Sequence, residues 1–369
     1  MTAYFKDPKD GANYANLSRL SRSDMNAWIT GIRKLDTASL QRSLRFNSIH
    51  QPSNIFGGGI QKKAGVLITF TATQWRAVSV SAFATTTGDP FTVSSGTTLP
   101  ASPTITSFAF NAYGADVLVM ANAGHAYIFP HTLTSIARYP FSVITTVSDV
   151  LWSDYSSQFV AVGSASGIGR IETSPDGQTW TNKNLNSTGG YGQLASDVTG
   201  QYILAHPTTQ NVWVYSEDGG DTWVQITKSI GDDPTPIPTG IAYDNHRGIW
   251  VATFSSTNEP FKVWYTDVPT ADWTPCYAEV DSSGLVGESV ARLNRIITIG
   301  SHWLVVASSN NHSNLTLSSN GGTSWVAGAS LAHTSSSQSF LRRAGDYLLL
   351  GKAGSSQTIQ AISGSFYPE

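Results

Sequence analysis

The residues of this chain with the most distinctive chemistry lie in three short runs, at residues 174–180, 216–223 and 318–325. Each run places Ser, then Asp or Asn, then Gly, then Thr or Ser, and finally Trp in the same order. Ser, Asp and Asn oxygens accept hydrogen bonds from nearby backbone N–H groups, and Gly supplies the positive φ that a tight turn needs. These residue types therefore predict hydrogen-bonded turns rather than bond-making chemistry.

Each run follows an apolar segment that is typical of a strand, at residues 170–173, 212–215 and 314–317. We therefore expect hairpins in which the Trp begins and anchors the return strand. We also expect Asp218 to accept backbone hydrogen bonds within its own hairpin. The residues predicted to build the three turns are Ser174, Asp176, Gly177, Thr179 and Trp180; Ser216, Asp218, Gly220, Thr222 and Trp223; and Ser318, Asn320, Gly322, Ser324 and Trp325.

A longer repeat contains these turns. A short apolar strand recurs seven times, and its centres are Leu67, Leu118, Val160, Ile203, Trp250, Leu304 and Leu348. The spacings between successive centres are 51, 42, 43, 47, 54 and 44 residues. A period of about 40 to 50 residues is typical of a four-stranded propeller blade. We assign each centre to the second strand of a blade.

The clearest unit predicts four strands, at residues 148–152, 158–162, 169–172 and 179–181, so the turn at 174–180 joins the third strand to the fourth. The last unit has three strands and ends near Ile362. Residues 39–47 precede the first unit and are expected to supply the missing strand, because an open ring would leave two unpaired edges. The predicted fold is all-β: a seven-bladed β-propeller over residues 46–369, preceded by an arm with a helix over residues 1–45.

These residues resemble the Asp-box, or bacterial-neuraminidase-repeat, family of β-propellers over roughly residues 50–365. The run at Ser216 matches the family pattern S-x-D-x-G-x-T-W at every fixed position, and the run at Ser174 is one residue short. The third run has Asn320 for Asp and Ser324 for Thr. The resemblance implies turns at the blade periphery that stabilise the fold and take no part in catalysis.

A sialidase is the enzyme that the resemblance suggests first. It implies three converging arginines, a Tyr–Glu nucleophile pair and an acid/base Asp. The family's Arg-Ile-Pro element is missing, because Arg76 is followed by Ala77. The other arginines have no recognisable setting; they are Arg138, Arg170, Arg247, Arg292, Arg295, Arg342 and Arg343. We predict no catalytic residue, and a sialidase-like glycosidase is kept as the alternative.

The sequence gives little support for a metal site, a cofactor site or a pair of catalytic acids. The eight His show neither i,i+4 nor Cys-paired spacing, so no metal is predicted, and no Gly-rich phosphate loop precedes a helix, so no cofactor is predicted. The acidic pair Asp232–Asp233 is interpreted as a solvated loop beside Pro234. Cys276 is the single cysteine and is interpreted as a small buried apolar residue.

The amino-acid composition limits which kinds of partner are expected. Charged residues make up 13% of the chain, against about 25% in an average globular protein. The net charge is −3 and no Lys/Arg run occurs, so nucleic acid is not an expected partner. The apolar runs are no longer than strands, which predicts no membrane insertion. The first residues lack the apolar core of a signal peptide.

The first 45 residues lie outside the repeat. Residues 6–13 are polar and expected to be extended. A helix is predicted to begin at Ser23 as N-cap, with an apolar face that needs a surface to cover it. That surface is either the propeller itself or another subunit. The residues of this predicted assembly anchor are Met25, Trp28, Ile29, Ile32 and Leu35.

In style, the Ser/Thr-rich loops, few charges, single Cys and added arm resemble a bacteriophage virion protein of the tail, fibre or capsid surface. That resemblance implies a non-enzymatic structural and binding propeller, made in the host cytoplasm and located in the virion. Its arm would bind other virion proteins within a homo-oligomer or symmetric assembly, and its propeller would contact a host surface glycan or receptor. A third hypothesis is a bacterial assembly factor that binds one protein on the propeller face.

Overall fold

The computed structural model divides the chain into two compact units, residues 45–363 and residues 1–44 together with 364–369. The sequence prediction had placed 364–369 with the propeller. The structure describes residues 5–6, 13–14, 45–46, 66–70, 75–79, 92–96, 107–110, 117–122, 124–130, 137–183, 185, 187–208, 212–227, 237–255, 263–276, 292–299, 302–308, 312–318, 321–332, 339–344, 347–352 and 359–363.

Every described strand of the larger unit belongs to one of seven sheets, numbered here sheet 1 to sheet 7. The strands of sheets 1 to 3 are β4 (Val66–Phe70), β5 (Trp75–Ser79) and β6 (Thr92–Gly96); β7 (Ser107–Phe110), β8 (Val117–Asn122), β9 (His125–Pro130) and β10 (Ala137–Pro140); and β11 (Thr146–Ser153), β12 (Gln158–Ala165), β13 (Ile168–Ser174) and β14 (Thr181–Asn182) with β15 (Ser187–Thr188).

Sheets 4 to 7 follow the same order. Their strands are β16 (Tyr191–Ser196), β17 (Ile203–Pro207), β18 (Val212–Ser216) and β19 (Val224–Thr227); β20 (Ile237–Asp244), β21 (Ile249–Ser255), β22 (Val263–Thr266) and β23 (Thr274–Pro275); β24 (Arg292–Ile299), β25 (His302–Ser308), β26 (His312–Ser318) and β27 (Val326–Ala332); and β28 (Ser339–Ala344), β29 (Tyr347–Lys352), β30 (Ile359–Ser363) and β3 (Arg45–Phe46).

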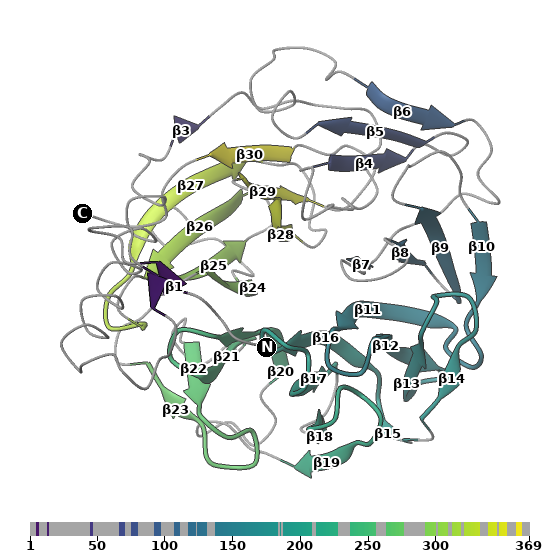
Figure 1. Ribbon diagram of the computed structural model, residues 1–369. Coiled ribbons are helices and arrows are strands. Elements are labelled where there is room, and N and C mark those ends of the chain that lie inside the picture. The colour runs from purple at the N-terminus through teal and green to yellow at the C-terminus, as the bar shows by residue number, and fades with distance from the viewer. Residues whose placement is uncertain are drawn as a thin grey trace. The chain divides into compact units, whose positions relative to one another are not determined.

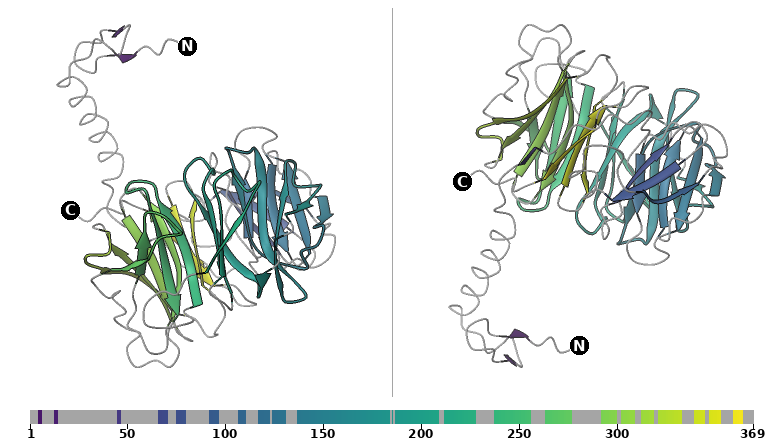
Figure 2. Two further views of the ribbon diagram at one scale, coloured as in Figure 1. Left: turned by 90° about the horizontal axis from the view of Figure 1, so that it is seen from below. Right: turned by 90° about the horizontal axis from the view of Figure 1, so that it is seen from above.

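Each strand of a sheet pairs antiparallel with the next strand in that order, except that β15 pairs with β13. The first strand of each sheet therefore lies at one edge. Figure 1 shows the sheets grouped around a common centre, with the first strands β7, β11, β16, β20, β24 and β28 nearest to it. Figure 2 shows the same sheets from the side, standing next to one another. The fold is a β-propeller, the class that the sequence predicts.

The last sheet is completed by the start of the larger unit. β3 pairs with β30, with Arg45 opposite Ser363 and Phe46 opposite Ile362. The prediction that residues 39–47 supply the missing strand is confirmed at Arg45 and Phe46. The two ends of this unit are therefore joined by backbone pairing, which covers the outer edge of β30 at Ser363 and Ile362.

The predicted second strands agree with the sheets in six of seven cases, because β8, β12, β17, β21, β25 and β29 are second in their sheets. Val160, Ile203 and Leu304 are fully buried. Leu67 lies in β4, the edge strand of the three described strands of sheet 1. Whether β4 is the second strand of its blade therefore stays untested. The sequence also suggested that this apolar strand includes Tyr202, which is wrong: β17 begins at Ile203, and Tyr202 precedes it and is 38% exposed.

The Trp residues also differ from the prediction. Trp180, Trp223 and Trp325 come immediately before β14, β19 and β27 and do not begin these strands. In the first two cases the indole N–H donates to a carbonyl of the turn itself, which keeps the Trp in the turn.

The core lies between neighbouring sheets. β12 is buried along almost its whole length, which explains its continuous apolar run: both of its faces are covered. Between sheets 4 and 5 the rings of Trp213 and Trp273 lie 5.4 Å apart, with Trp250 and Phe254 in the same cluster. Packing of these large aromatic rings positions sheet 4 against sheet 5.

Two predictions lie outside the described residues: the helix with Met25, Trp28, Ile29, Ile32 and Leu35, and the loop with Asp232–Asp233. In the smaller unit the described elements are β1 (Phe5–Lys6) and β2 (Asn13–Tyr14), which pair antiparallel. Residues 6–13, predicted to be an extended segment, therefore begin and end in a paired hairpin.

Candidate functional site

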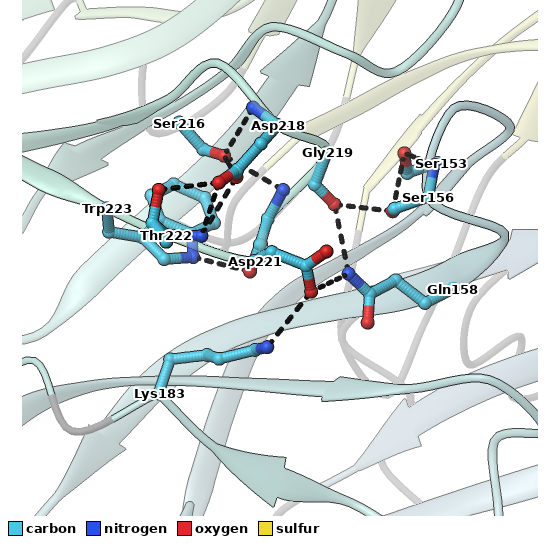
Figure 3. Close-up of polar contacts among 11 residues, drawn as sticks. Ser153, Ser156, Gln158, Lys183, Ser216, Asp218, Gly219, Asp221, Thr222 and Trp223 are labelled. Carbon is cyan, nitrogen blue, oxygen red and sulfur yellow. Dashed lines mark hydrogen bonds and ion pairs between the residues drawn. The ribbon is translucent and has the colours of Figure 1, made fainter.

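The turn at residues 216–223 is a closed set of hydrogen bonds (Figure 3). The Asp218 carboxylate accepts from the backbone N–H of Thr222 at 2.8 and 3.0 Å and from its hydroxyl at 2.5 Å. The Ser216 hydroxyl donates to Asp218 and accepts from the Gly220 N–H, both at 2.8 Å. The Trp223 indole donates to the Gly220 carbonyl oxygen at 2.9 Å. Asp218 thus makes the bonds within its own hairpin that the sequence predicts.

The turn at residues 174–180 repeats this arrangement. Asp176 accepts from the Thr179 N–H and from the Ser174 hydroxyl, both at 3.0 Å. The Gly177 N–H donates to the Ser174 hydroxyl oxygen at 2.8 Å, and the Trp180 indole donates to the Gly177 carbonyl oxygen at 2.9 Å. Although this turn is one residue shorter, its Ser, Asp and Trp side chains have the same roles.

The turn at residues 318–325 keeps only part of the pattern. The Gly322 N–H donates to the Ser318 hydroxyl oxygen at 2.9 Å, as in the other two turns. The buried indole nitrogen of Trp325 has no hydrogen-bond partner among the described residues. Ser324 is exposed, and Asn320 lies outside the described residues. The backbone part of the motif is therefore present here, whereas its indole bond is not.

Hydrogen bonding decides the charge state of the two turn carboxylates. Partial burial raises the pKa of Asp218, but bonds from Thr222 and Ser216 outweigh it, and the pKa lies below its ordinary value of 3.8. Burial likewise raises the pKa of Asp176, and bonds led by the N–H of Thr179 bring it below 3.8. Both carboxylates are therefore charged at neutral pH and serve as acceptors, which makes them unsuited to general acid catalysis there.

The turn at 216–223 also contacts the preceding sheet (Figure 3). The Gly219 carbonyl oxygen accepts from the Ser156 hydroxyl at 2.7 Å and from the Gln158 amide at 3.3 Å. Asp221 accepts from the same amide at 3.0 Å and pairs with the Lys183 ammonium at 3.2 Å. Ser156, Gln158 and Lys183 all belong to sheet 3 or its connections, so the turn links sheets 3 and 4.

Asp149 is a buried carboxylate that joins the first strands of three sheets. It lies on β11 and accepts from the Ser107 hydroxyl of β7 and from the backbone N–H of Leu194 in β16, the latter at 2.9 Å. The N–H of Val150 also donates to it, at 3.0 Å. The pairing of β11 with β12 shifts register between Val147 and Asp149. Such a bulge re-aims a side chain, here toward the neighbouring sheets.

The same shift of register recurs in the first strands of the next three sheets, at residues 191–194, 238–240 and 293–295. In β16 the side-chain oxygen of Gln193 accepts from the backbone N–H of Ile241 in β20, at 3.3 Å. Polar side chains at two successive bulges thus bind the backbone of the following sheet. These contacts connect sheets 2 to 5 along their first strands.

Glu172 holds the connection between sheets 2 and 3. It lies on β13 and is fully buried. Its carboxylate accepts from three consecutive backbone N–H groups, at 2.7 Å from Ser142 and at 2.6 Å from both Val143 and Ile144. These residues belong to the segment between β10 and β11. Three backbone donors thus fix this carboxylate to the connection between sheets 2 and 3.

Asp244 links sheets 5 and 6 and is also fully buried. It accepts from the Arg247 guanidinium at 2.7 Å and from the backbone N–H groups of His246 and Arg247 at 2.9 and 3.1 Å. The Trp303 indole of β25 donates to the same carboxylate at 2.7 Å. The Arg247 guanidinium lies 5.7 Å from the centre of the Trp303 ring, a cation–π distance.

Sequence reasoning missed all three of these buried carboxylates, because it searched for arginine clusters, histidine spacing and neighbouring acids. One signal was present: Asp149 and Glu172 each interrupt an apolar strand. A charged group is rarely buried unless it is paired or hydrogen-bonded, so an acid inside a strand indicates fixed donors nearby. Each group is occupied by such donors, and the arrangement joins sheets rather than presenting a reactive group.

The arginines considered for a glycosidase are spread over the fold. Arg138 lies on β10 and contacts the His125 ring at 3.1 Å, Arg170 lies on β13, and Arg247 is held by Asp244. The others lie on the strands β5, β24 and β28; they are Arg76, Arg292, Arg295, Arg342 and Arg343. The three whose side chains are described belong to three different sheets.

Cys276 follows β23 and is buried, which raises the pKa of its thiol to about 12. Its prediction as a small buried residue is confirmed. No group of three or more His, Cys, Asp and Glu side chains placed to hold a metal occurs in the part of the chain described. Within the same residues, no helix has the length and apolar character needed to cross a membrane.

No protein-family model matches the chain, and neither does any curated protein. Solved structures match by fold. Virginiamycin B lyase from Staphylococcus aureus has a TM-score of 0.58 and 11% identity, covering 87% of this chain and 99% of its own. The WD40 domain of Neurospora crassa Pan2 has a TM-score of 0.56 and 10% identity, with 87% and 96% covered.

The β-propeller domain of Myceliophteria thermophila Cps50 (Swd1) has a TM-score of 0.59 and 10% identity, with 87% and 99% covered. At these identities the three structures share the fold with this chain and nothing more specific. They are β-propellers, which agrees with the sheets described above. A shared fold alone does not establish a shared function.

Proposed function

We propose that this chain is a non-enzymatic structural and binding propeller of a bacteriophage particle. In this proposal the seven sheets are the blades of one closed ring, and residues 1–45 attach the ring to other particle proteins in a homo-oligomer or symmetric assembly. The propeller then bridges neighbouring subunits or contacts the host surface.

The proposal that the chain is not an enzyme rests on the hydrogen bonds of its buried carboxylates. Asp149, Glu172 and Asp244 each accept hydrogen bonds from another sheet or from a connection between sheets. Groups occupied in this way stabilise the boundaries between sheets. An acid or nucleophile would instead need an accessible reacting atom. A rigid ring is what a structural component requires.

The attachment part rests on the sequence. Few charges and many Ser and Thr residues resemble the composition of phage particle proteins. Residues 1–44, together with 364–369, form a compact unit of their own. The apolar positions Met25, Trp28, Ile29, Ile32 and Leu35 need a surface to cover them. The Asp-box resemblance supports a peripheral, stabilising role for the turns.

The test is assembly by truncated chains. Deleting residues 1–36, while keeping 39–47 for the β3–β30 pairing, should leave a folded propeller that no longer sediments with the particle proteins encoded by neighbouring genes. Trp28→Asp should weaken assembly less, because it places one charge on the apolar face. If the truncated chain assembled normally, or if it unfolded, the attachment role would be refuted. Neighbouring genes without portal, capsid or tail proteins would refute the phage assignment.

The alternatives predict different results. A sialidase-like glycosidase would release 4-methylumbelliferone from its α-sialoside. One of the structures that share this fold is a virginiamycin B lyase, so turnover of virginiamycin B is measured as a second assay. Catalytic turnover in either assay would overturn the non-enzymatic proposal. A bacterial assembly factor would instead form a stable complex with a single host protein and would not enter particles.

A further inference from the structure

The turns of the propeller that join first to second strands, and third to fourth strands, lie on one face because each sheet is an antiparallel series. We call this the turn face. Its described residues are 154–157, 197–202, 244–248, 175–179, 217–222, 267–272 and 321–324. The opposite face includes the described segments 141–145, 166–167 and 187–190.

Exposed apolar side chains are concentrated on the turn face. Seven large hydrophobic residues are exposed among the described residues. Four lie in its turns: Tyr155, Val198, Tyr202 and Val268; two more, Val224 and Val326, begin the strand that leaves such a turn. The seventh, Ile168, is beside the opposite face. Val198 is 74% exposed and Tyr155 is 56% exposed. Exposed apolar side chains that lie on neighbouring turns, as Tyr155 and Val198 do, indicate an interaction surface.

The described turn face is rich in carboxylates. The turn residues contain nine carboxylates and one cation, Arg247, which is paired with the buried Asp244. Asp221 is paired as well, with Lys183. The carboxylates of the turn face are Asp154, Asp176, Asp197, Glu217, Asp218, Asp221, Asp244, Asp267 and Asp272. Summed charge of one sign attracts a partner of the opposite sign.

The central turns of this face are held in place by one another. The backbone N–H of Tyr155 donates to the Thr199 carbonyl oxygen at 2.9 Å, which joins sheets 3 and 4. The N–H of Val198 donates to the Asn245 side chain at 2.9 Å, which joins sheets 4 and 5. Tyr155 and Val198 therefore lie on adjacent, mutually bonded turns. A surface fixed in this way loses little conformational entropy on binding.

We propose that the turn face, centred on Tyr155 and Val198, is a docking surface for a cationic segment of a partner protein that also carries aliphatic side chains. Four of the six apolar residues are Val, which suit aliphatic protein contacts, whereas sugar rings stack on aromatic side chains. Anionic glycans are repelled by the carboxylates. Two copies of this chain meeting turn face to turn face are disfavoured for the same reason, since like charges would be juxtaposed.

This inference rests on the binding role proposed above but not on the phage assignment or on the arm. The probe is a synthetic amphipathic peptide of lysine and leucine, compared with a glutamate–leucine peptide of equal length and leucine content. Binding to the full chain is measured by isothermal titration calorimetry. We expect binding of the lysine peptide only, weakening as salt is raised.

Variants locate the binding. The double variant Tyr155→Ser/Val198→Ser should raise the Kd for the lysine peptide by about tenfold or more. Glu217→Lys should raise it by a few-fold. Ile168→Ser controls for loss of an exposed apolar side chain on the opposite face. Ser142→Lys/Thr145→Lys controls for the change of two charge units that Glu217→Lys makes. Both controls should stay within about twofold of the parent chain, and melting temperatures confirm that all variants are folded.

Equal binding of the two peptides, equal losses in the controls, or no binding at millimolar peptide would each overturn the inference. So would tighter binding to neutral or anionic glycans at Tyr155, or self-association that Val198→Ser abolishes. Assembly through residues 1–36 is a separate readout. A chain that assembles normally but fails to bind the lysine peptide would therefore refute the docking surface and leave the proposed function intact.

Discussion

The indole nitrogen of Trp303 donates a hydrogen bond of 2.7 Å to the carboxylate of Asp244, across the boundary between sheets 6 and 5. Because Asp244 is fully buried and also binds Arg247, Asp244→Ala should lower the free energy of unfolding by about 3–5 kcal/mol. The variant leaves a partly buried guanidinium without its counter-ion and a buried indole without its acceptor. Chemical denaturation measures the loss.

Trp303→Phe keeps an aromatic ring but removes the donor, so its expected loss is smaller, about 2–3 kcal/mol. Trp152→Phe is the matched control, because the Trp152 indole makes a bond of the same 2.7 Å length to the exposed carboxylate of Asp154. We expect this control to lose less than about 1 kcal/mol. Equal losses in the two Trp variants would show that burial of the pair does not matter.

Asp218 should stabilise its turn without taking part in binding. Asp218→Ala removes the acceptor of the Thr222 N–H and hydroxyl and should lower stability by about 1–3 kcal/mol. Asp267→Ala is the control, since Asp267 is an exposed carboxylate in the corresponding turn of sheet 5. Thermal melting compares the two. A variant that kept its melting temperature and lost peptide binding would contradict the structural role of Asp218.

The two turn carboxylates should make stability depend on pH in the acid range. Their pKa values are lower in the folded chain than the ordinary 3.8, so the folded state binds these protons more weakly than the unfolded state. The stability they contribute is therefore present above about pH 4 and lost as pH falls through the folded pKa values.

Melting temperatures from pH 7 down to about pH 2 test this against Asp176→Asn/Asp218→Asn. The difference between the parent chain and the double variant should be constant near neutral pH and should shrink below about pH 4. A difference that stayed constant over the whole range would show that these carboxylates do not titrate with folding.

Gly220 should not tolerate a side chain. Its φ is 98°, and a Cβ added there would lie 2.8 Å from Cγ2 of Val160 in sheet 3. Gly220→Ala should therefore cost about 2–4 kcal/mol of stability from backbone strain and overpacking together. Gly167→Ala isolates the strain, because Gly167 has a φ of 76° with no atom within 4 Å of the added Cβ. Similar losses at both glycines would argue against a tight contact between turn and sheet.

Cys276 should be inert while the chain is folded. Burial raises the pKa of its thiol to about 12, so almost none is thiolate at pH 8. Ellman's reagent should react with it only in denaturant, with one thiol released per chain. Fast labelling of the native chain at pH 8 would show that the site between β23 and Gly322 opens readily.

What the sequence determined by itself is local. The bonds of the turn at 216–223 join residues at most four positions apart, such as Ser216 to Gly220 and Asp218 to Thr222, so the order of residue types is enough to predict them. The propeller class followed in the same way, because the period of the apolar strands reflects a unit that repeats along the chain.

Only the tertiary structure decided the partners of the buried carboxylates. Asp149 meets the Leu194 N–H 45 residues away, and Asp244 meets Trp303 59 residues away. Both contacts depend on which sheet packs beside which, and for Asp149 on a bulge that turns its side chain across the boundary. A bulge and the geometry of packed sheets arise from many weak contacts acting together. No single residue pattern encodes them, so the sequence showed Asp149 only as an interruption of an apolar strand and Asp244 only as an acid next to a turn.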